Sequence, residues 1–291
     1  MAEELVGIIG GTGLGDALAA EIGGAELQNV DTPFGAPSAD IMTGTFGKRR
    51  IAFLNRHGEG HKLSPSEVPF AANIFALKKL GARAVIGSGA VGSLREEIAP
   101  GELVVADQFI DKTYRRTSSF FGGYGAVHCE MAQPVCRRLG RILLSAADRI
   151  GAKTHPKGTY VCMEGPQFST RAESLMHRAW GADLIGMTAM PEAKLAREAQ
   201  MCYALVALAS DYDCWRPHEQ AKSRQTLLEE IIGNLKTATS NCLELIKAVL
   251  SSEDGLVDGR CECRGSLGLA VWTDQSRIGR AERQRLSVLF E

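Results

Sequence analysis

Short apolar runs that alternate with longer amphipathic segments restrict the fold of this chain more than any other feature of its sequence. Four of the runs have the length and composition of buried strands, namely 6–9, 50–54, 84–86 and 203–209. The segments 69–80 and 134–150 instead place their apolar residues at the spacing of one helical face. This alternation predicts one α/β domain with a mainly parallel or mixed central β-sheet flanked by helices.

The composition changes after about residue 250, where the chain becomes polar, rich in arginine and irregular. With 291 residues, 45% of them hydrophobic, the chain is long enough to bury a large core. We therefore expect residues 1–250 to form the folded domain. Residues 251–291 are expected to be a tail that is partly disordered or that contacts a neighbouring subunit.

The charge balance argues against two classes of partner. The 33 basic and 34 acidic residues give a formal net charge of −1, without the basic stripe that attracts nucleic acid or a membrane surface. No apolar run reaches the roughly 20 residues of a membrane helix, and no basic segment followed by an apolar one opens the chain. We therefore expect a cytoplasmic protein that binds neither nucleic acid nor membranes.

Glycine and polar residues follow directly where several apolar runs end. Five such segments are the glycine-rich 10–15 with Thr12, Arg56-His57, the small residues 87–93, Met187-Thr188 and Asp211-Tyr212-Asp213. Ligands of open α/β sheets bind at the carboxyl ends of the strands, where such segments meet. The sequence therefore predicts one ligand site assembled from these segments.

The glycine-rich segment 10–15 and the pair Arg56-His57 suit an oxyanion. The spacing of the glycines is not that of a dinucleotide-binding loop, and no lysine follows them as in a Walker loop. Backbone N–H groups and the Thr12 hydroxyl can still donate to a phosphate, although an ordinary tight turn explains the same glycines equally well. Arg56 would add a planar fork of N–H donors, and His57 a second donor.

Asp211 and Asp213 have the same parity at the end of a predicted strand, so their carboxyl groups are expected to point the same way. Two neighbouring carboxylates raise each other's pKa, which lets one stay protonated near neutral pH and act as a general acid. Such a general acid suits a purine leaving group, which needs a proton at N7. The second carboxylate can accept a hydrogen bond from an exocyclic amine of the base. A turn or a divalent-metal site would use the same pair, but no third carboxylate clusters with it. Phe168 is able to stack on a base, although a single Phe near a proline more often belongs to a core.

Eight cysteines are spread along the chain, and most lie among apolar neighbours, which predicts buried thiols. The pair Cys261-Glu262-Cys263 differs because it lies in the polar C-terminal segment. No second Cys pair and no His pair lies near it in the sequence, so we expect no metal site. A redox or disulfide role of this pair stays open.

Seven motifs occur in order over about residues 5–250. They are Gly10-Gly11-Thr12-Gly13, Arg56-His57-Gly58, Gly92-Ser93-Leu94-Arg95-Glu96-Glu97, Asp107-Gln108-Phe109-Ile110-Asp111, Glu164-Gly165-Pro166-Gln167-Phe168-Ser169, Gly186-Met187-Thr188 and Asp211-Tyr212-Asp213-Cys214-Trp215. Together they resemble the 5′-methylthioadenosine phosphorylases of the trimeric purine nucleoside phosphorylase family.

The resemblance implies a single α/β domain of the purine nucleoside phosphorylase type, with a central mixed β-sheet flanked by helices. It implies phosphorolysis of 5′-methylthioadenosine to adenine and 5-methylthioribose 1-phosphate, as in purine and methionine salvage. Inorganic phosphate would be the co-substrate, without a metal or organic cofactor. The chain would form a homotrimer, or a hexamer built from trimers.

The resemblance also assigns roles to single residues. Phosphate would be held by Thr12, Arg56, His57, Gly89, Ala90 and Thr188. The nucleoside would contact Phe168, Ser169, Met187, Tyr212 and Asp213, with Asp211 as the catalytic residue that assists departure of the base at N7. The 5′ pocket would be lined by Leu227 and Leu228 and reached by His128 of a neighbouring subunit, and Ser169 and Arg224 would influence specificity.

The residue at position 211 separates the alternative substrates. A 6-oxopurine enzyme of the family is expected to carry Asn in place of Asp211, because N7–H and O6 need a different donor pattern. Three positions depart from the family pattern: Gly89, Gly186 and Arg224. They leave adenosine as an alternative substrate beside inosine or methylthioinosine, and a non-catalytic Rossmann-type nucleotide-binding module is a further hypothesis.

The cysteines add one hypothesis that rests on the resemblance alone. Heat-adapted members of the family are similar to this chain around Cys136 and Cys202, and they also carry a C-terminal Cys-x-Cys. On that similarity we hypothesise that disulfides form. Eight titratable thiols in the denatured, unreduced protein would exclude them.

Overall fold

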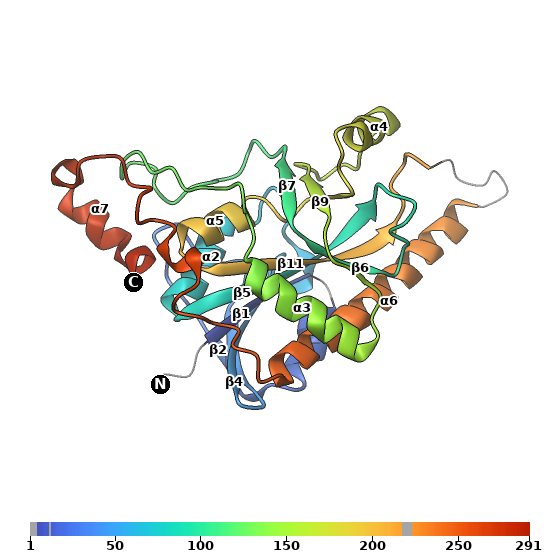
Figure 1. The fold of residues 1–291 in the computed structure, drawn as a ribbon, viewed down its shortest axis with the longest axis horizontal. Coiled ribbons are helices and arrows are strands. Elements are labelled where there is room, and N and C mark those ends of the chain that lie inside the picture. The colour runs from blue at the N-terminus through green and yellow to red at the C-terminus, as the bar shows by residue number, and fades with distance from the viewer. Residues whose placement is uncertain (1–4, 12, 217–222) are drawn as a thin grey trace.

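The computed structural model describes residues 5–11, 13–216 and 223–291, which form one α/β body (Figure 1). The strands are β1 Leu5–Gly10, β2 Gly23–Gln28, β3 Ile41–Phe46, β4 Arg49–Asn55, β5 Ala82–Ser93, β6 Leu103–Ala106, β7 Gln108–Asp111, β8 Thr154–His155, β9 Thr159–Cys162, β10 Leu184–Gly186 and β11 Cys202–Asp211. The helices are α1 Leu14–Ala19, α2 Phe70–Lys79, α3 Arg137–Ile150, α4 Arg171–Ala179, α5 Glu192–Glu198, α6 Arg224–Ser251 and α7 Arg280–Arg285, with short 3-10 turns η1 Glu59–His61, η2 Glu262–Gly265, η3 Gln275–Arg277 and η4 Ser287–Phe290. The predicted single α/β domain is confirmed.

The strands form one mixed sheet with a parallel centre. β4, β1, β5 and β11 lie side by side in that order and run the same way. β3, β6 and β10 join this centre in the antiparallel sense. The carboxyl ends of the four central strands therefore meet at one edge, and the segments 10–15, 56–57 and 211–213 lie there. The segment 87–93, predicted to follow a strand, belongs to β5 itself, and Met187-Thr188 follows the antiparallel strand β10.

The long strand β5 extends past the carboxyl end of its neighbour β1, and this leaves a gap in the sheet. β1 pairs with β5 only as far as Gly87, and β10 pairs with Gly92 and Ser93 further along. On its other side, β5 stays paired with β11 from Ala84 to Gly92. The stretch 88–91 therefore has one edge without a neighbouring strand among the described residues.

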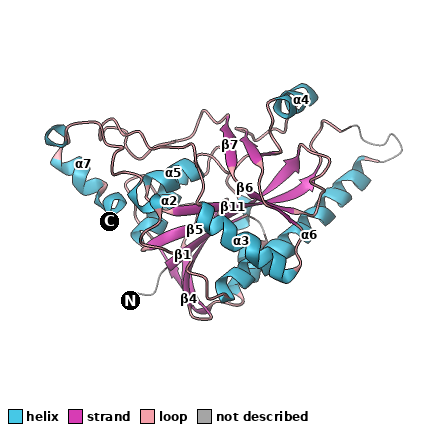
Figure 2. Ribbon diagram, viewed as in Figure 1, coloured by secondary structure: helices cyan, strands magenta, loops and turns pink. Residues whose placement is uncertain are grey.

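Each face of the sheet buries its own hydrophobic core, as Figure 2 shows by the helices on both sides of the strands. The alternation along β1 illustrates the division. Ile9 packs in one core with α2 and α5, whereas Ile8 packs in the other with α1, α3 and α6. Successive side chains of a strand point to opposite faces, so a continuous apolar run supplies both cores.

The C-terminal segment 251–291, predicted to be partly disordered or to contact a neighbouring subunit, packs onto the domain in this structure. Leu267, Leu286 and Leu289 are at most 5% exposed and belong to the main core. The side chain of Gln200 donates to the Leu289 carbonyl over 2.9 Å. Single apolar residues of this segment pack into the core although their neighbours are polar. The average composition of the segment does not reveal such single contacts. Contact of this segment with another subunit stays a prediction.

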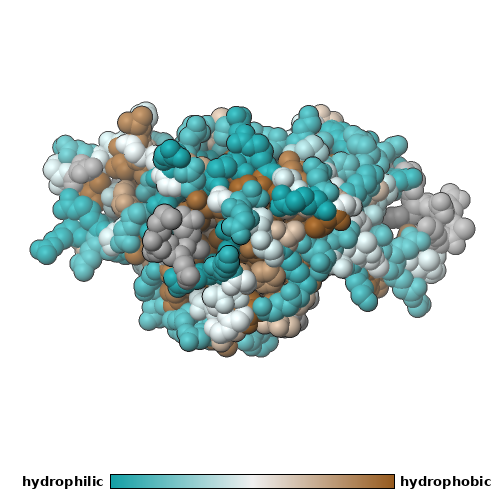
Figure 3. All heavy atoms as spheres, turned by 60° about the horizontal axis from the view of Figure 1, so that its bottom comes forward, coloured by the Kyte–Doolittle hydropathy of each residue, from teal (hydrophilic) through white to brown (hydrophobic). Residues whose placement is uncertain are grey.

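The described helices include none that is long and apolar enough to cross a membrane. The face of the molecule in Figure 3 is largely hydrophilic, with apolar side chains in smaller groups between the polar ones.

Candidate active site

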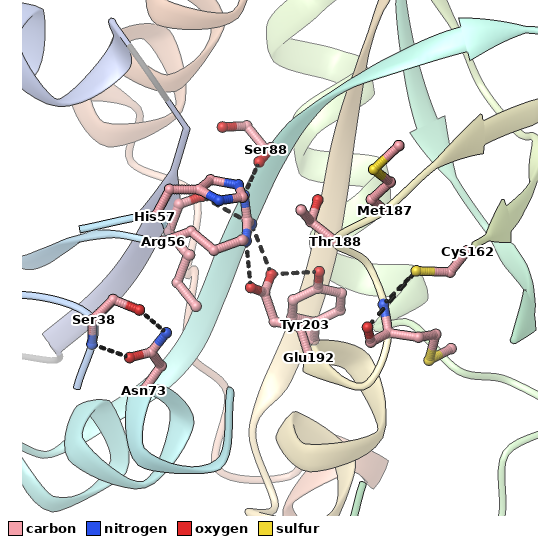
Figure 4. Close-up of polar contacts among 12 residues, drawn as sticks. Ser38, Arg56, His57, Asn73, Ser88, Cys162, Met187, Thr188, Glu192 and Tyr203 are labelled. Atoms are coloured by element: carbon pink, nitrogen blue, oxygen red, sulfur yellow. Dashed lines mark hydrogen bonds and ion pairs between the residues drawn. The ribbon is translucent and has the colours of Figure 1, made fainter. Parts of the chain in front are cut away.

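Arg56 lies deepest among the residues of the predicted site. It follows β4 directly, and its side chain is 1% exposed. Its Nε donates to Glu192 Oε2 over 2.8 Å and its Nη2 to Glu192 Oε1 over 2.9 Å, so the two form a bidentate ion pair (Figure 4). The Tyr203 hydroxyl also donates to Glu192 Oε1, over 2.8 Å. The charge of Arg56 is therefore balanced within the protein.

Glu192 carries no signal in the sequence that ties it to Arg56. It begins α5, more than one hundred positions further along the chain. An acid that is 1% exposed is expected to be paired. Which residue pairs with Glu192, however, depends on how α5 packs against the central strands.

One N–H of Arg56 remains for a ligand after its contacts with the described residues are counted. Nη1 donates to the Ser88 carbonyl over 2.6 Å, and Nη2 approaches the Ile9 carbonyl at 3.5 Å. With the two bonds to Glu192, four of the five guanidinium N–H groups are used. The fifth belongs to Nη1, which lies 4.0 Å from where a Cβ on Gly89 would be.

Thr188 faces the same space from the other side. A Cβ on Gly89 would lie 3.0 Å from Thr188 Oγ1, so the absence of a side chain at position 89 keeps this space open. Figure 4 shows Arg56 and Thr188 on either side of the ribbon of β5. The structure thus brings together Arg56, Gly89 and Thr188, three of the residues assigned to phosphate.

The backbone of β5 adds a donor at Ala90. The Ser88 carbonyl points into the gap beside β5, because Arg56 Nη1 donates to it there. In a strand, the backbone polar groups of alternate residues point to the same side. The N–H of Ala90 therefore faces the same gap, on the edge of β5 that has no strand partner in the described structure.

His57 lies beside the glycine loop, where a hollow of about 250 Å³ is lined by Gly11, Gly13 and His57 among others. Its Nδ1 lies 2.8 Å from the Leu63 carbonyl, which can only accept, so the neutral ring carries its proton on Nδ1. Burial lowers the pKa of His57 to about 4, and the ring is neutral at pH 7. Nε2 is then an acceptor. In this state His57 offers an acceptor that suits a protonated phosphate oxygen, and the prediction that it donates to phosphate stays untested.

Local backbone conformation and packing also explain why glycine occupies positions in the loop 10–15. Gly13 has φ 90°, a left-handed conformation that suits glycine. A Cβ on Gly15 would lie 2.6 Å from the Phe53 ring, so close packing requires glycine there. Thr12 lies outside the described residues, and its contact with phosphate stays a prediction.

The loop that carries Met187 and Thr188 is held by an arginine. Arg116 Nη1 donates to the carbonyls of Met187 and Met190, over 2.6 Å each, and its Nε pairs with Glu164 at 3.2 Å. Burial by itself would raise the pKa of Glu164. Hydrogen bonds from Ser66 and from two backbone amides outweigh it and lower the pKa to about 2. The carboxylate is therefore ionised and fixes Arg116.

Asp211 and Asp213 meet beside Gly92 at the other end of the site. A Cβ on Gly92 would lie 3.2 Å from Asp211 Oδ1 and 3.1 Å from Asp213 Cβ. β11 ends at Asp211, and Asp213 has φ 49°, so the turn brings the two acids together and strand parity does not. Asp211 accepts from the Asp213 amide and the Ser210 hydroxyl, over 2.7 Å each, while Asp213 accepts from Ser174. Burial raises the pKa of Asp213.

The segment before α4 lies next to this pair of acids. Cys214 Sγ donates to the Ser169 carbonyl over 3.3 Å, which places Ser169 near the turn of the acids. Phe168 is 86% exposed, so the explanation that it belongs to the core is wrong, and its stacking on a base stays a prediction. Tyr212 packs edge-on against Trp215, with ring centroids 6.0 Å apart.

The two ends of the site are separated by the length of a nucleoside. Gly89 marks the phosphate end and Gly92 the end with the acids, and both belong to β5. Three residues of a strand span about 10 Å. A ligand lying along β5 is therefore able to contact Thr188 and Asp211 at the same time.

Four residues assigned by the resemblance lie elsewhere or outside the described atoms. The backbone N–H of His128 donates to the Ala270 carbonyl over 2.9 Å, and its ring packs edge-on against Trp272, so it lies with the C-terminal segment. Leu227 and Leu228 stand in the first turns of α6, with Leu228 57% exposed. The side chain of Arg224 is outside the described structure. Their roles stay predictions.

Known proteins are similar to the chain over nearly its whole length. A profile of the phosphorylase superfamily matches residues 5–251. The S-methyl-5′-thioadenosine phosphorylase of Geobacter sulfurreducens is 44% identical over 294 residues, covering 99% of this chain and 98% of the relative. A solved methylthioadenosine phosphorylase from an Antarctic soil metagenomic library has a TM-score of 0.89 and 42% identity, with 100% of each chain covered. A variant of the adenosine/methylthioadenosine phosphorylase of Schistosoma mansoni, in complex with adenine, has a TM-score of 0.79 and 36% identity and covers 86% of this chain and 92% of its own.

Proposed function

Because this chain belongs to the phosphorylase superfamily, we propose that its site catalyses phosphorolysis of 5′-methylthioadenosine. The products are adenine and 5-methylthioribose 1-phosphate. The observation that carries the proposal is the separation of about 10 Å along β5 between the donors at Gly89 and the acids at Gly92, which matches a nucleoside with phosphate beneath its sugar.

Phosphate binds in a cradle of hydrogen bonds whose net charge is close to zero. Arg56 contributes its free Nη1 donor, but its charge is matched by Glu192. The Thr188 hydroxyl and the Ala90 amide donate, and Nε2 of His57 accepts from the protonated oxygen of the anion. The phosphate therefore keeps its negative charge for the sugar, where positive charge develops as the bond to the base breaks.

The reaction is a displacement at C1′. A phosphate oxygen forms the bond to C1′ while the bond from C1′ to N9 breaks, and its electron pair moves into the purine ring. A proton at N7 neutralises the departing base. Groups that stabilise both partners of this exchange must lie on opposite sides of the sugar, and the proposal assigns Thr188 to one side and Asp211 to the other.

The acids recognise the 6-aminopurine. We assign Asp211 to N7 and Asp213 to the exocyclic amine, with one proton shared by the pair. Burial raises the pKa of Asp213. The Ser174 hydroxyl and the Asp213 amide hold the two carboxyl groups in place.

The 5′ end of the nucleoside is covered by a second copy of the chain in this proposal. We assign that cover to His128 of a neighbouring subunit, facing Leu227 and Leu228, in a homotrimer or a pair of trimers. Phe168, Leu228 and Ile232 are 86%, 57% and 57% exposed in the single chain, as expected of apolar side chains that another subunit covers. Phosphate is the co-substrate in this proposal, which needs no cofactor.

The direct test is release of adenine from 5′-methylthioadenosine with and without phosphate. We expect release only with phosphate and an equal amount of sugar phosphate. Release without phosphate indicates a hydrolase and overturns the proposal. Adenosine is the second substrate to measure, because the Schistosoma mansoni relative is named for both nucleosides. Faster turnover of inosine than of adenosine contradicts the assignment of the acids.

A variant tests the phosphate end by itself. Thr188→Val removes the hydroxyl and keeps the shape, so the KM for phosphate should rise while the KM for the nucleoside changes little. Thr45→Val on β3, far from the gap in the sheet, is the matched control and should change neither.

A further inference from the structure

Four cysteine side chains from three distant parts of the chain meet in one cluster. Cys136 precedes α3, Cys202 begins β11, and Cys261 and Cys263 belong to the C-terminal segment at η2. Their four Sγ atoms all lie within 4.8 Å of one another, and those of Cys136 and Cys261 are 3.7 Å apart. We call these four residues the cysteine cluster.

The distance between the sulfur atoms distinguishes a metal ion bound by several thiolates from a disulfide bond. Zinc bound by four thiolates at about 2.3 Å in a tetrahedron holds the sulfurs about 3.8 Å apart. A disulfide instead needs two sulfurs at about 2.05 Å. All four thiols are free, and the separation of Cys136 from Cys261 matches the edge of such a tetrahedron.

We propose that Cys136, Cys202, Cys261 and Cys263 bind one Zn²⁺ ion as a structural site. Four protein ligands complete a tetrahedral shell, so no position is left for a water or a substrate, as is typical of structural zinc. Three of the ligands are at most 5% exposed and Cys261 is partly exposed, which leaves the ion a route of entry.

Positive groups offset the charge of the site. Four thiolates and one Zn²⁺ carry a net charge of −2, and binding releases one proton from each thiol that was protonated. Arg138 Nη2 donates to Cys202 Sγ at 3.7 Å, and its Nε is buried without a hydrogen-bond partner among the described residues. Arg197 lines the same pocket as Cys261 and Cys263. Such donors around the ligands are usual at thiolate metal sites.

The cluster lies far from the reacting groups. Cys202 and Asp211 stand at opposite ends of β11, nine residues apart, which corresponds to about 30 Å. The ion would therefore not take part in phosphorolysis. It would tie the C-terminal segment to α3 and β11, and its removal should affect stability before chemistry. The prediction of no metal site rested on the absence of other cysteines near Cys261 and Cys263 in the sequence. The fold brings Cys136 and Cys202 next to them.

The experiment is elemental analysis of the full chain, purified under reducing conditions without chelator. We expect about one zinc per chain in the wild type and in Cys129→Ser, and a loss of most zinc in Cys261→Ser. Cys129 is a matched control because it is also partly exposed and lies outside the cluster. A chelator should lower the Tm of the wild type and leave that of Cys261→Ser unchanged.

Two measurements on the wild type hold even if Cys261→Ser fails to fold. Cobalt(II) added to chelator-treated protein should give the absorption bands of a tetrahedral site with four thiolates, and zinc should abolish them. Titration of the denatured, unreduced protein should find eight thiols. Four or six thiols without zinc would show disulfides instead, iron in place of zinc would overturn the choice of metal, and eight thiols without cobalt binding would show that there is no site.

Discussion

Arg56 and Glu192 form a buried bidentate ion pair beneath the proposed phosphate site, with N–O distances of 2.8 and 2.9 Å. Both side chains are 1% exposed. A buried charge that loses its partner is costly, so this pair is a point where stability and function depend on the same contact.

We expect Glu192→Gln to destabilise the protein by about 3 kcal/mol, at the lower end of the effect of removing one partner of a buried pair, because Gln keeps one acceptor. Urea unfolding measures the change. Asp183→Asn is the control, because it breaks the ion pair of Asp183 with Arg95. The side chains of Arg95 and Asp183 are 25% and 28% exposed, so this variant should lose less than about 1 kcal/mol of stability. Equal losses in the two variants would show that burial of the first pair does not matter.

The buried, neutral His57 predicts a loss of stability in acid. Its folded-state pKa of about 4 lies below the ordinary histidine pKa of 6.5, so protonation favours the unfolded chain. The contribution of the neutral ring is complete above pH 6.5 and is lost as the pH falls towards 4. The free energy of unfolding should decrease over this interval more in the wild type than in His57→Gln. Parallel curves for the two proteins would contradict the lowered pKa.

The acceptor role of His57 has a separate consequence for binding. An unprotonated Nε2 accepts from a phosphate that carries a proton and gains nothing from one that does not. The KM for phosphate should therefore rise as the pH passes the second ionisation of phosphate. In His57→Gln, whose amide can also donate, this rise should be smaller.

Asp211→Asn should lower turnover of 5′-methylthioadenosine by about 10²- to 10⁴-fold, the range typical of losing a general acid. Turnover of methylthioinosine should fall far less, because an amide suits the donor pattern of a 6-oxopurine. Steady-state kinetics on both nucleosides separate these effects. Equal losses on both would mean that Asp211 does not recognise the base.

Gly186 provides a test of packing beside Thr188. A Cβ at this position would lie 2.1 Å from the Tyr160 hydroxyl, which accepts from the Thr188 amide at 3.3 Å. Gly186→Ala should therefore cost about 1–3 kcal/mol and raise the KM for phosphate. Gly122→Ala is the control, since a Cβ there meets no atom within 4 Å and its φ is not in the left-handed range. It should leave both quantities unchanged.

The folded C-terminal segment predicts different effects for two leucines. Leu289 is fully buried, and Leu289→Ala should cost about 2–5 kcal/mol. Leu269 is 95% exposed, and Leu269→Ala should stay within about 0.5 kcal/mol. Thermal or urea unfolding of the two variants compares them. A neutral Leu289→Ala would restore the prediction of a loosely attached tail.

The apolar runs and their spacing were sufficient to predict the α/β domain, because strands and helices bury periodic patterns that depend only on neighbouring residues. The same reasoning placed Arg56 and Asp211 at one edge, since the ends of parallel strands meet there. Thr188 joins them although it follows the antiparallel strand β10. The motifs also identified the family. These conclusions follow from local sequence and needed no coordinates.

Only the tertiary structure determined which distant groups became partners. Glu192 neutralises Arg56 because α5 packs against the central strands, and the Leu63 carbonyl fixes the proton of His57 on Nδ1. Cys261 and Cys263 meet Cys136 and Cys202 because the C-terminal segment returns to the start of β11. Side-chain chemistry can be read from the sequence, but charge state, tautomer and shared ligands depend on contacts between residues far apart in the chain, and those are set when the whole core packs.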